Sequence, residues 1–317
     1  MTSKDTTEAK RSTVSFSGHE TFVFRHGWLK KAVDALRRNP MAFGSDDALV
    51  ELGVGKNMVR SIRFWGLATN VIEEVPKTRG AQLRPSAFGK FLFGEDGRDP
   101  YLEDPNSLWL LHWNLVNDEV RSTTWCWAFN LPHPNEFTKE SIADVLSHEL
   151  LRRGIKGPSG HSLRRDIDCF VRTYAAPKAT RGAVMEDSLD CPLVELGLLL
   201  EDAASGTLQF RRGFQKSLAC EVFVYALVDF WEKVAPDRES LAFPDIAYAF
   251  GSPGVAFKLD ESSLAQRLER LEDATNGVLA YVETAGLKQV YRRSTVSPMD
   301  MLGRYYEHSD PKFLIGA

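Results

Sequence analysis

DDALVELGVGKNMVRSIRFWGLATNVIEEVPKTRGAQLRPSAFGKFL, residues 46–92, is the stretch that decides the fold of the N-terminal third. Its apolar residues from Ala48 to Leu52 predict a short helix. Gly53-Val54-Gly55 then ends this helix, because glycine tolerates the positive φ angles of a tight turn. A second helix is predicted from about Lys56 to Trp65, where apolar residues recur at helical spacing.

The residues after the second helix predict a β-hairpin. Ala68 to Val75 is rich in β-branched residues, and Ala81 to Arg84 forms a second extended run. Between them, Pro76-Lys77-Thr78-Arg79-Gly80 has the proline and glycine typical of a turn. Two helices followed by a hairpin outline a winged helix-turn-helix, which usually places its second helix in the major groove of DNA.

The predicted second helix and the hairpin carry side chains suited to DNA. Asparagine and arginine make bidentate hydrogen bonds to adenine and guanine edges. From Lys56 to Arg84 six basic residues stand against two acidic ones, a local charge of +4 in a chain of formal net charge −4. We expect DNA contacts from Lys56, Asn57, Arg60, Arg63, Lys77 and Arg79. The alternative is a helical protein-interaction module with ordinary solvated charges.

The composition limits the other functions open to the chain. With 317 residues, 43% of them hydrophobic, the chain can form two or three domains with real cores. Its slightly acidic balance excludes a protein that coats nucleic acid by bulk charge. No run approaches the ~18 apolar residues that span a membrane, and the N-terminus lacks a signal-peptide core. We therefore expect a cytoplasmic protein without membrane contact.

The cysteines point to the same compartment. Four of them are far apart and show no C-x-x-C pairing: Cys126, Cys169, Cys191 and Cys220. This spacing argues against a structural zinc site and favours reduced, buried thiols in a cytoplasm.

A second helix pair with a basic face is predicted downstream. Thr138 is a suitable N-cap for its first helix, and Ser162 to Tyr174 predicts the second. Between Leu151 and Gly182 eight basic residues stand against two acidic ones, a local charge of +6. An acid-binding patch for a partner protein is an alternative, and Asp166 and Asp168 could pair with nearby arginines. We expect DNA contacts from Arg152, Arg153, Arg164, Arg165 and Arg172.

An aromatic segment lies between the two basic units. Its first part, Asp99 to Pro105, predicts a turn, and Ser107 to Trp113 predicts a buried helix with Trp109 and Trp113 in the core. We expect this segment to pack the two units together. The chain beyond Ala183 is expected to be mainly helical.

These patterns predict a mainly α-helical fold with small β-hairpins and two winged helix-turn-helix-like units. The predicted divisions are a disordered tail over 1–15, an N-terminal winged helix-turn-helix over 16–98, an aromatic helical linker with a second helix-turn-helix-like unit over 99–182, and a mainly helical C-terminal domain over 183–317.

Four motifs resemble, in order, a bacterial family long described only as a domain of unknown function. They are Phe16-Ser17-Gly18-His19-Glu20-Thr21-Phe22, GVGKNMVRSIRFW (53–65), DPYLEDPNSLWLLHW (99–113) and SLRRDIDCFVRTY (162–174). The resemblance runs from about Phe16 to Tyr306. Genes of this family often lie beside phosphoadenosine-phosphosulfate-reductase-like enzymes.

The resemblance implies a part in DNA phosphorothioate modification and phage defence, in which sulfur replaces a non-bridging phosphate oxygen. Its implied partners are double-stranded DNA and the other proteins of a sulfur-modification complex. One member is described as a DNA nickase. A nickase that opens one strand for sulfur incorporation and a non-catalytic adaptor that recruits the modification enzymes both remain open. A transcriptional regulator of the same locus is a third possibility.

Strand cleavage would need a general base and, in most enzymes, a metal held by carboxylates. No assembled nuclease signature is present in the sequence. The best local pair is His19 as base and Glu20 as ligand for Mg²⁺ or Mn²⁺, with Arg25 and His26 nearby. Asp104, in the acidic DPYLED run, offers a further metal ligand.

Each of these candidates has a structural alternative. In the alternative for the residues around His19, they have no catalytic role and cap the first helix. In the alternative for the DPYLED run, it is a turn with acidic caps. A tyrosine nucleophile is a further alternative, at Tyr174, Tyr305 or Tyr306. Without catalysis, no cofactor is expected.

Overall fold

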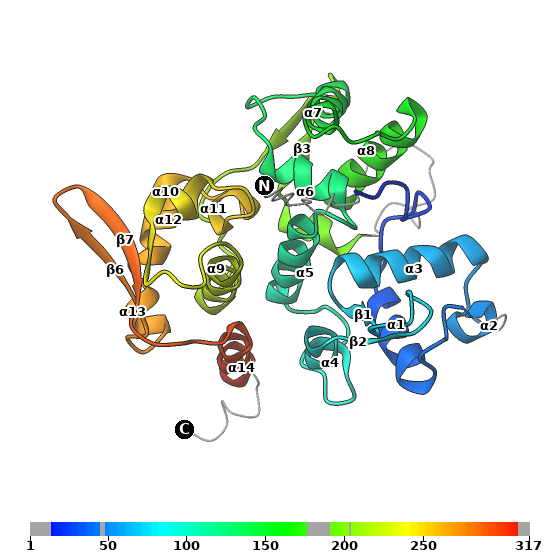
Figure 1. The fold of residues 1–317 in the computed structure, drawn as a ribbon, viewed down its shortest axis with the longest axis horizontal. Helices are drawn as coiled ribbons and strands as arrows, with labels where there is room; N and C mark the ends of the chain where they lie inside the picture. The colour runs from blue at the N-terminus through cyan, green and yellow to red at the C-terminus, as the bar shows by residue number, and fades with distance from the viewer. Residues whose placement is uncertain (1–13, 45–47, 176–190, 203, 310–317) are drawn as a thin grey trace, which may run out of the picture.

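The computed structural model describes residues 14–44, 48–175, 191–202 and 204–309. The expected tail over 1–15 therefore lies almost wholly outside the described residues, as do Lys178 and Arg181 of the second basic unit. The described part is mainly α-helical with small antiparallel sheets, as the sequence predicts. Its elements follow one another as three groups, coloured blue to cyan, green, and yellow to red in Figure 1.

The first group contains the stretch that decides the N-terminal fold. Helix α1 packs against α3, α4 and strand β2, and the hairpin pairs Ile72 with Pro85 and Glu74 with Leu83. Helix α3, predicted from Lys56 to Trp65, continues three residues further, because Gly66, Leu67 and Ala68 are buried. The elements are α1 (Trp28–Arg38), α2 (Ala48–Leu52), α3 (Lys56–Ala68), β1 (Ile72–Glu74), β2 (Leu83–Pro85) and α4 (Ala87–Phe93).

The second group contains the aromatic helix and the second helix pair. Thr138 caps the N-terminus of α7 through the backbone N–H of Ser141, as predicted. Trp109 and Trp113 are buried, which confirms their expected core positions. The elements are α5 (Pro105–Asn117), α6 (Thr123–Asn130), α7 (Lys139–Arg152), α8 (Gly160–Tyr174), the 3₁₀ helix η2 (Pro192–Leu196), β3 (Leu199–Glu201) and β4 (Leu208–Phe210).

The third group is built on a buried helix, α9, against which α13 and α14 pack. Strands β5, β7 and β6 form an antiparallel sheet in that order. The elements are α9 (Cys220–Val234), β5 (Ser240–Ala242), α10 (Phe243–Tyr248), α11 (Pro253–Ala256), α12 (Glu261–Leu268), α13 (Leu271–Ala274), β6 (Leu279–Thr284), β7 (Leu287–Arg292) and α14 (Pro298–Ser309).

The buried apolar residues of all three groups form one continuous core. The rings of Trp65 and Trp125 meet edge to face at 5.2 Å and join the first group to the second. At the far end of the chain, Tyr306 of α14 returns to contact Phe91 of α4. The four cysteines form no disulfide with one another; Cys126, Cys169 and Cys191 are buried as expected, and Cys220 is partly buried. None of the helices within the described residues is long and apolar enough to cross a membrane.

Candidate nucleic-acid interface

Helix α3 presents a polar face to solvent and an apolar face to the core. Ile62 and Trp65 are fully buried, and Trp65 Nε1 donates a hydrogen bond to the carbonyl oxygen of Phe22 at 2.9 Å. Lys56 and Asn57 are exposed in the first turn, and neither forms a side-chain bond with another described residue. The buried tryptophan therefore fixes which face of α3 can meet a ligand.

The hairpin after α3 is tied to that helix by Arg63. Its guanidinium group lies 3.6 Å from a carboxylate oxygen of Glu74 and donates to the carbonyl oxygen of Gly80 at 3.4 Å. Lys77 and Arg79 are exposed in the connecting turn and have φ angles of 68° and 53°. Such angles are uncommon outside glycine. Arg63 thus holds the hairpin, while the tip cations remain available.

The second basic face lies on α8. Arg164 is exposed and Arg165 half-buried, and neither forms an ion pair within the described part of the chain. The carboxylate of Asp168 accepts from Lys139 of α7 at 2.7 Å, whereas its backbone carbonyl oxygen accepts from Arg172 Nε at 3.4 Å. The predicted ion pair of the Asp168 carboxylate with an arginine is therefore wrong.

Arg152 and Arg153, unlike Arg164 and Arg165, pair with carboxylates within the protein. Arg152 and Arg153 donate to Glu149 at 2.5–2.7 Å. These hydrogen bonds, with the positive charges of both arginines, lower the pKa of Glu149 to about 2. Arg153 also pairs with Glu119 and lies over the ring of Trp127. The structure thus gives these two predicted DNA contacts partners at the end of α7.

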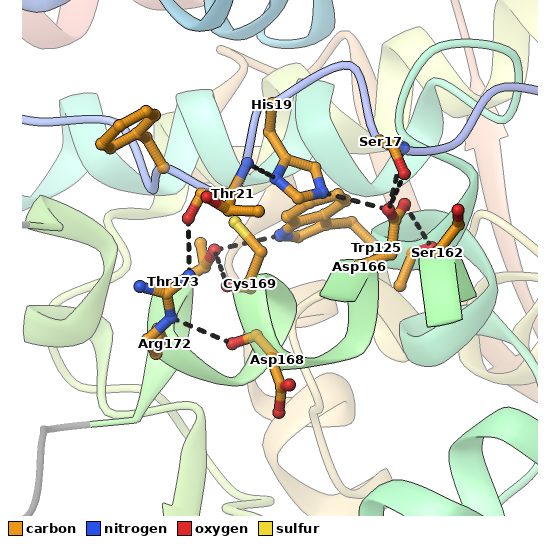
Figure 2. A network of polar contacts seen from close by, with 12 residues as sticks. Ser17, His19, Thr21, Trp125, Ser162, Asp166, Asp168, Cys169, Arg172 and Thr173 are labelled. Atoms are coloured by element: carbon orange, nitrogen blue, oxygen red, sulfur yellow. Dashed lines mark hydrogen bonds and ion pairs between the residues drawn. The ribbon is translucent and has the colours of Figure 1, made fainter. Parts of the chain in front are cut away.

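A short loop, residues 17–22, is anchored to the buried carboxylate of Asp166 on α8. Asp166 accepts from the backbone N–H of Ser17 at 2.8 Å, and His19 Nε2 lies 3.1 Å from the same carboxylate oxygen. Its other oxygen accepts from Thr124 at 3.2 Å. Figure 2 shows Ser17 and His19 both pointing toward Asp166. The interpretation of Asp166 as an arginine partner is also wrong.

The loop is strained and closely packed, which explains its unusual sequence. Ser17, Glu20 and Thr21 have φ angles of 64°, 49° and 69°, and such strained residues cluster at functional sites. A Cβ atom at Gly18 would lie 2.6 Å from the ring of Phe64 on α3. Glycine at this position therefore lets the loop lie directly against α3.

The same loop joins the two basic helices. Arg60 of α3, with a side chain 56% exposed, pairs with Glu20 at 3.2 Å. Arg172 of α8 donates to the carbonyl oxygen of the adjacent Thr21 at 2.6 Å (Figure 2). A depression of about 360 Å³ beside this bond is lined by Thr21, Lys139, Arg165, Asp168 and Arg172. Two basic units far apart in the sequence thus meet at one loop.

The candidate catalytic residues have separate partners. His19 is 1% exposed, and its Nδ1 accepts from the backbone N–H of Thr21 at 3.0 Å, so both ring nitrogens are engaged. Glu20 pairs with Arg60. The loop does not cap the first helix, because α1 begins at Trp28 with Gly27 as its N-cap. That alternative is wrong.

Asp104 caps the N-terminus of α5. Its carboxylate accepts from the backbone N–H of Asn106 at 2.8 Å and from the hydroxyl of Tyr305 at 3.1 Å. The interpretation of the DPYLED run as a turn with acidic caps is confirmed. Among the described residues, no three His, Cys, Asp or Glu side chains lie close enough together to hold a metal ion.

Sequence reasoning missed Asp166 as the anchor of the loop. The sequence feature that could have indicated this role is the position of Asp166 on the buried face of α8, beside Ile167 and one turn before Phe170. A carboxylate in such a position requires hydrogen-bond donors from another part of the chain.

The fold and this surface define a mainly helical protein in which one strained loop joins two basic helices. The chain belongs to the family described as "Protein of unknown function (DUF4007)", whose model matches residues 16–306. This membership confirms the resemblance predicted from the four motifs. No curated protein matches the chain.

Two solved structures are similar over almost the whole chain. One is described as a magnesium ion-bound SspB crystal structure and the other as an SspB crystal structure. Each is 34% identical to this chain, with 94% of this chain and 90% of the other covered and a TM-score of 0.83.

Proposed function

We propose that the chain is the DNA-binding component of a bacterial DNA phosphorothioate modification system. The observation that carries the proposal is the loop 17–22, which joins the exposed basic faces of α3 and α8. Lys56, Arg164 and Arg165 lack acidic partners among the described residues, in a protein of net charge −4. The similarity to SspB and the family membership support the assignment to that system.

In this proposal, residues 48–85 act as a winged helix-turn-helix. Helix α3 enters the major groove with Asn57 and Arg60 toward the bases, and the hairpin tip contacts phosphates. The bonds of Arg63 to Glu74 and Gly80 support this geometry, because they hold the hairpin beside the helix. Arg164, Arg165 and Arg172 extend the phosphate contacts along α8.

Fluorescence anisotropy with a labelled duplex tests this proposal. Replacing Lys56, Arg164 and Arg165 together by alanine should weaken binding and flatten its dependence on salt. Each lost phosphate contact changes the log–log slope by ~0.9. A control triple variant at Lys216, Lys233 and Arg270, which lie in the third group or just before it, should bind like the wild type. Equal behaviour of the two folded variants would refute the interface.

A second candidate function, strand nicking, is favoured by the magnesium ion bound in one SspB structure. The described residues of this chain do not fit a complete magnesium site, since Glu20 and Asp104 are both engaged elsewhere and no three-residue ligand group is present among them. Conversion of supercoiled plasmid to open circle in the presence of Mg²⁺ or Mn²⁺ distinguishes the nickase from an adaptor. Purified protein that leaves the plasmid intact while binding it would support the adaptor.

A further inference from the structure

A cavity whose lining includes no residue of α3 or α8 lies between the end of α6, strand β4 and helix α11. Its volume is about 590 Å³, within the range of pockets that bind small molecules. Its basic side chains are Arg211, Arg212 and Lys258, together with His133, and no Asp or Glu lines it. A cavity with three cations and no acid is unusual in a chain whose acidic residues outnumber its basic ones.

Lys258 is the central feature of this cavity. Its side chain is buried, and its Nζ donates to the carbonyl oxygen of Phe129 at 2.5 Å. The same nitrogen lies over the rings of Phe129 and Phe210, at 4.9 and 4.1 Å from their centroids. No carboxylate of the described residues pairs with it. A buried ammonium group without an anion is costly, and burial together with the charge of Arg212 holds the pKa of Lys258 well below its usual range.

His133 is a second side chain of this cavity with buried polar atoms, and these lack a partner among the described residues. Both of its ring nitrogens are buried and form no hydrogen bond with the described residues. Burial and the nearby charge of Lys258 lower its pKa to about 4. An imidazole in this state can both donate and accept a hydrogen bond. Buried polar groups without partners are rare in native proteins and call for an explanation such as a bound ligand.

We propose that this cavity binds a phosphate-bearing nucleotide. The phosphate would supply the missing anion for Lys258 and Arg212 and a hydrogen-bond partner for His133. A bare phosphate would leave most of the volume empty, whereas the apolar walls at Phe210 and Leu259 suit a sugar and base. Asn135 and Gln209 at the rim provide amides for the edge of the base. A free mononucleotide and a nucleotide unit of a DNA strand share this chemistry.

Isothermal titration of the full chain with dAMP, ATP, inorganic phosphate and a 5′-phosphorylated oligonucleotide tests the proposal. We expect dAMP or ATP to bind if the ligand is a free nucleotide, and only the oligonucleotide to bind if it is part of a strand. In either case Arg212→Ala, an exposed change that spares the core, should weaken binding about tenfold or more, as expected for a lost charge-assisted contact. Arg270→Ala, at an exposed position outside the cavity lining, should not.

A second variant keeps the test independent of folding and of the DNA interface. His133→Phe should lose nucleotide binding while retaining binding of duplex DNA through α3 and α8. Inorganic phosphate binding as tightly as every nucleotide probe would overturn the nucleotide assignment. Absence of binding by all four probes, or binding unchanged in both Arg212→Ala and His133→Phe, would overturn the site itself.

Discussion

His19 and Asp166 lie 147 positions apart in the chain, yet His19 Nε2 is 3.1 Å from Asp166 Oδ1. Because Nδ1 of His19 accepts the N–H of Thr21, the ring proton lies on Nε2, which donates to Asp166. This bond fixes the loop 17–22 on α8, and the loop in turn contacts α3 through Glu20. The relative placement of the two basic helices depends on this buried pair.

Asp166→Asn should therefore destabilise the protein by about 2–3 kcal/mol, because the amide cannot accept all four hydrogen bonds of the carboxylate and leaves buried donors without partners. Urea unfolding measures this loss. Asp168→Asn, two residues along the same helix but about half exposed, is the matched control. It should change stability by less than about 1 kcal/mol, as exposed ion pairs do. Equal losses in the two variants would contradict the anchoring role.

Glu20 holds Arg60 in an ion pair that DNA would have to replace. Glu20→Ala removes a negative charge from the proposed interface, so we expect it to strengthen duplex binding severalfold at low salt. Anisotropy titrations measure the change. Glu232→Ala, which breaks the ion pair with Arg292 in the third group, should leave binding unchanged.

The same Glu20→Ala variant tests the proposed role of Glu20 in nicking. If the wild type nicks supercoiled plasmid and Glu20 is a metal ligand, the variant should lose nicking while it keeps DNA binding. Nicking that survives in the variant would show that the ligand assignment is wrong. Asp104→Asn provides the parallel test for the second proposed ligand.

Arg60 and the hairpin tip should contribute differently to DNA binding. Arg60→Ala should cost about 1–3 kcal/mol on the preferred sequence and relax the choice of one base. Lys77→Asn with Arg79→Asn should weaken binding on all sequences and reduce the salt slope by about 2. Asparagine is chosen because it tolerates the left-handed conformation at both positions. Binding measured on a panel of base-substituted duplexes separates the two effects; identical profiles would contradict the winged-helix proposal.

Stability should fall as the pH falls from about 6.5 to 4. Burial lowers the pKa of His112 to about 3 and that of His133 to about 4, so both are neutral in the folded state at pH 5. In the unfolded chain both histidines bind a proton with the ordinary histidine pKa of about 6.5. The contribution of the two histidines to the free energy of unfolding is therefore complete above about pH 6.5. Below that pH it decreases by about 1.4 kcal/mol per pH unit for each histidine.

Urea unfolding at pH 7, 6 and 5 measures this slope. His133→Gln, at a site outside the tightly packed core around His112, should remove the contribution of one histidine. A stability that stays constant between pH 7 and 5 would contradict the neutral state of both side chains.

Local spacing predicted the helices and the caps well. The apolar periodicity of α3 and α8 and the N-cap at Thr138 depend on residues within a few turns of one another. The C-terminus of α3 was missed, because the residues after Trp65 are held in the helix by burial rather than by helix propensity. The partners of Asp166 and the cavity around Lys258 were also missed.

The sequence by itself determined which faces of the helices are buried and where basic residues concentrate, because both follow from the order of neighbouring residues. Only the tertiary structure decided which of those charges remain available. Glu119 pairs with Arg153 from outside α7, and Glu20 reaches Arg60 across 40 positions. The interaction between two charges depends on their burial and on the distance between them. Both depend on segments that only the fold brings together.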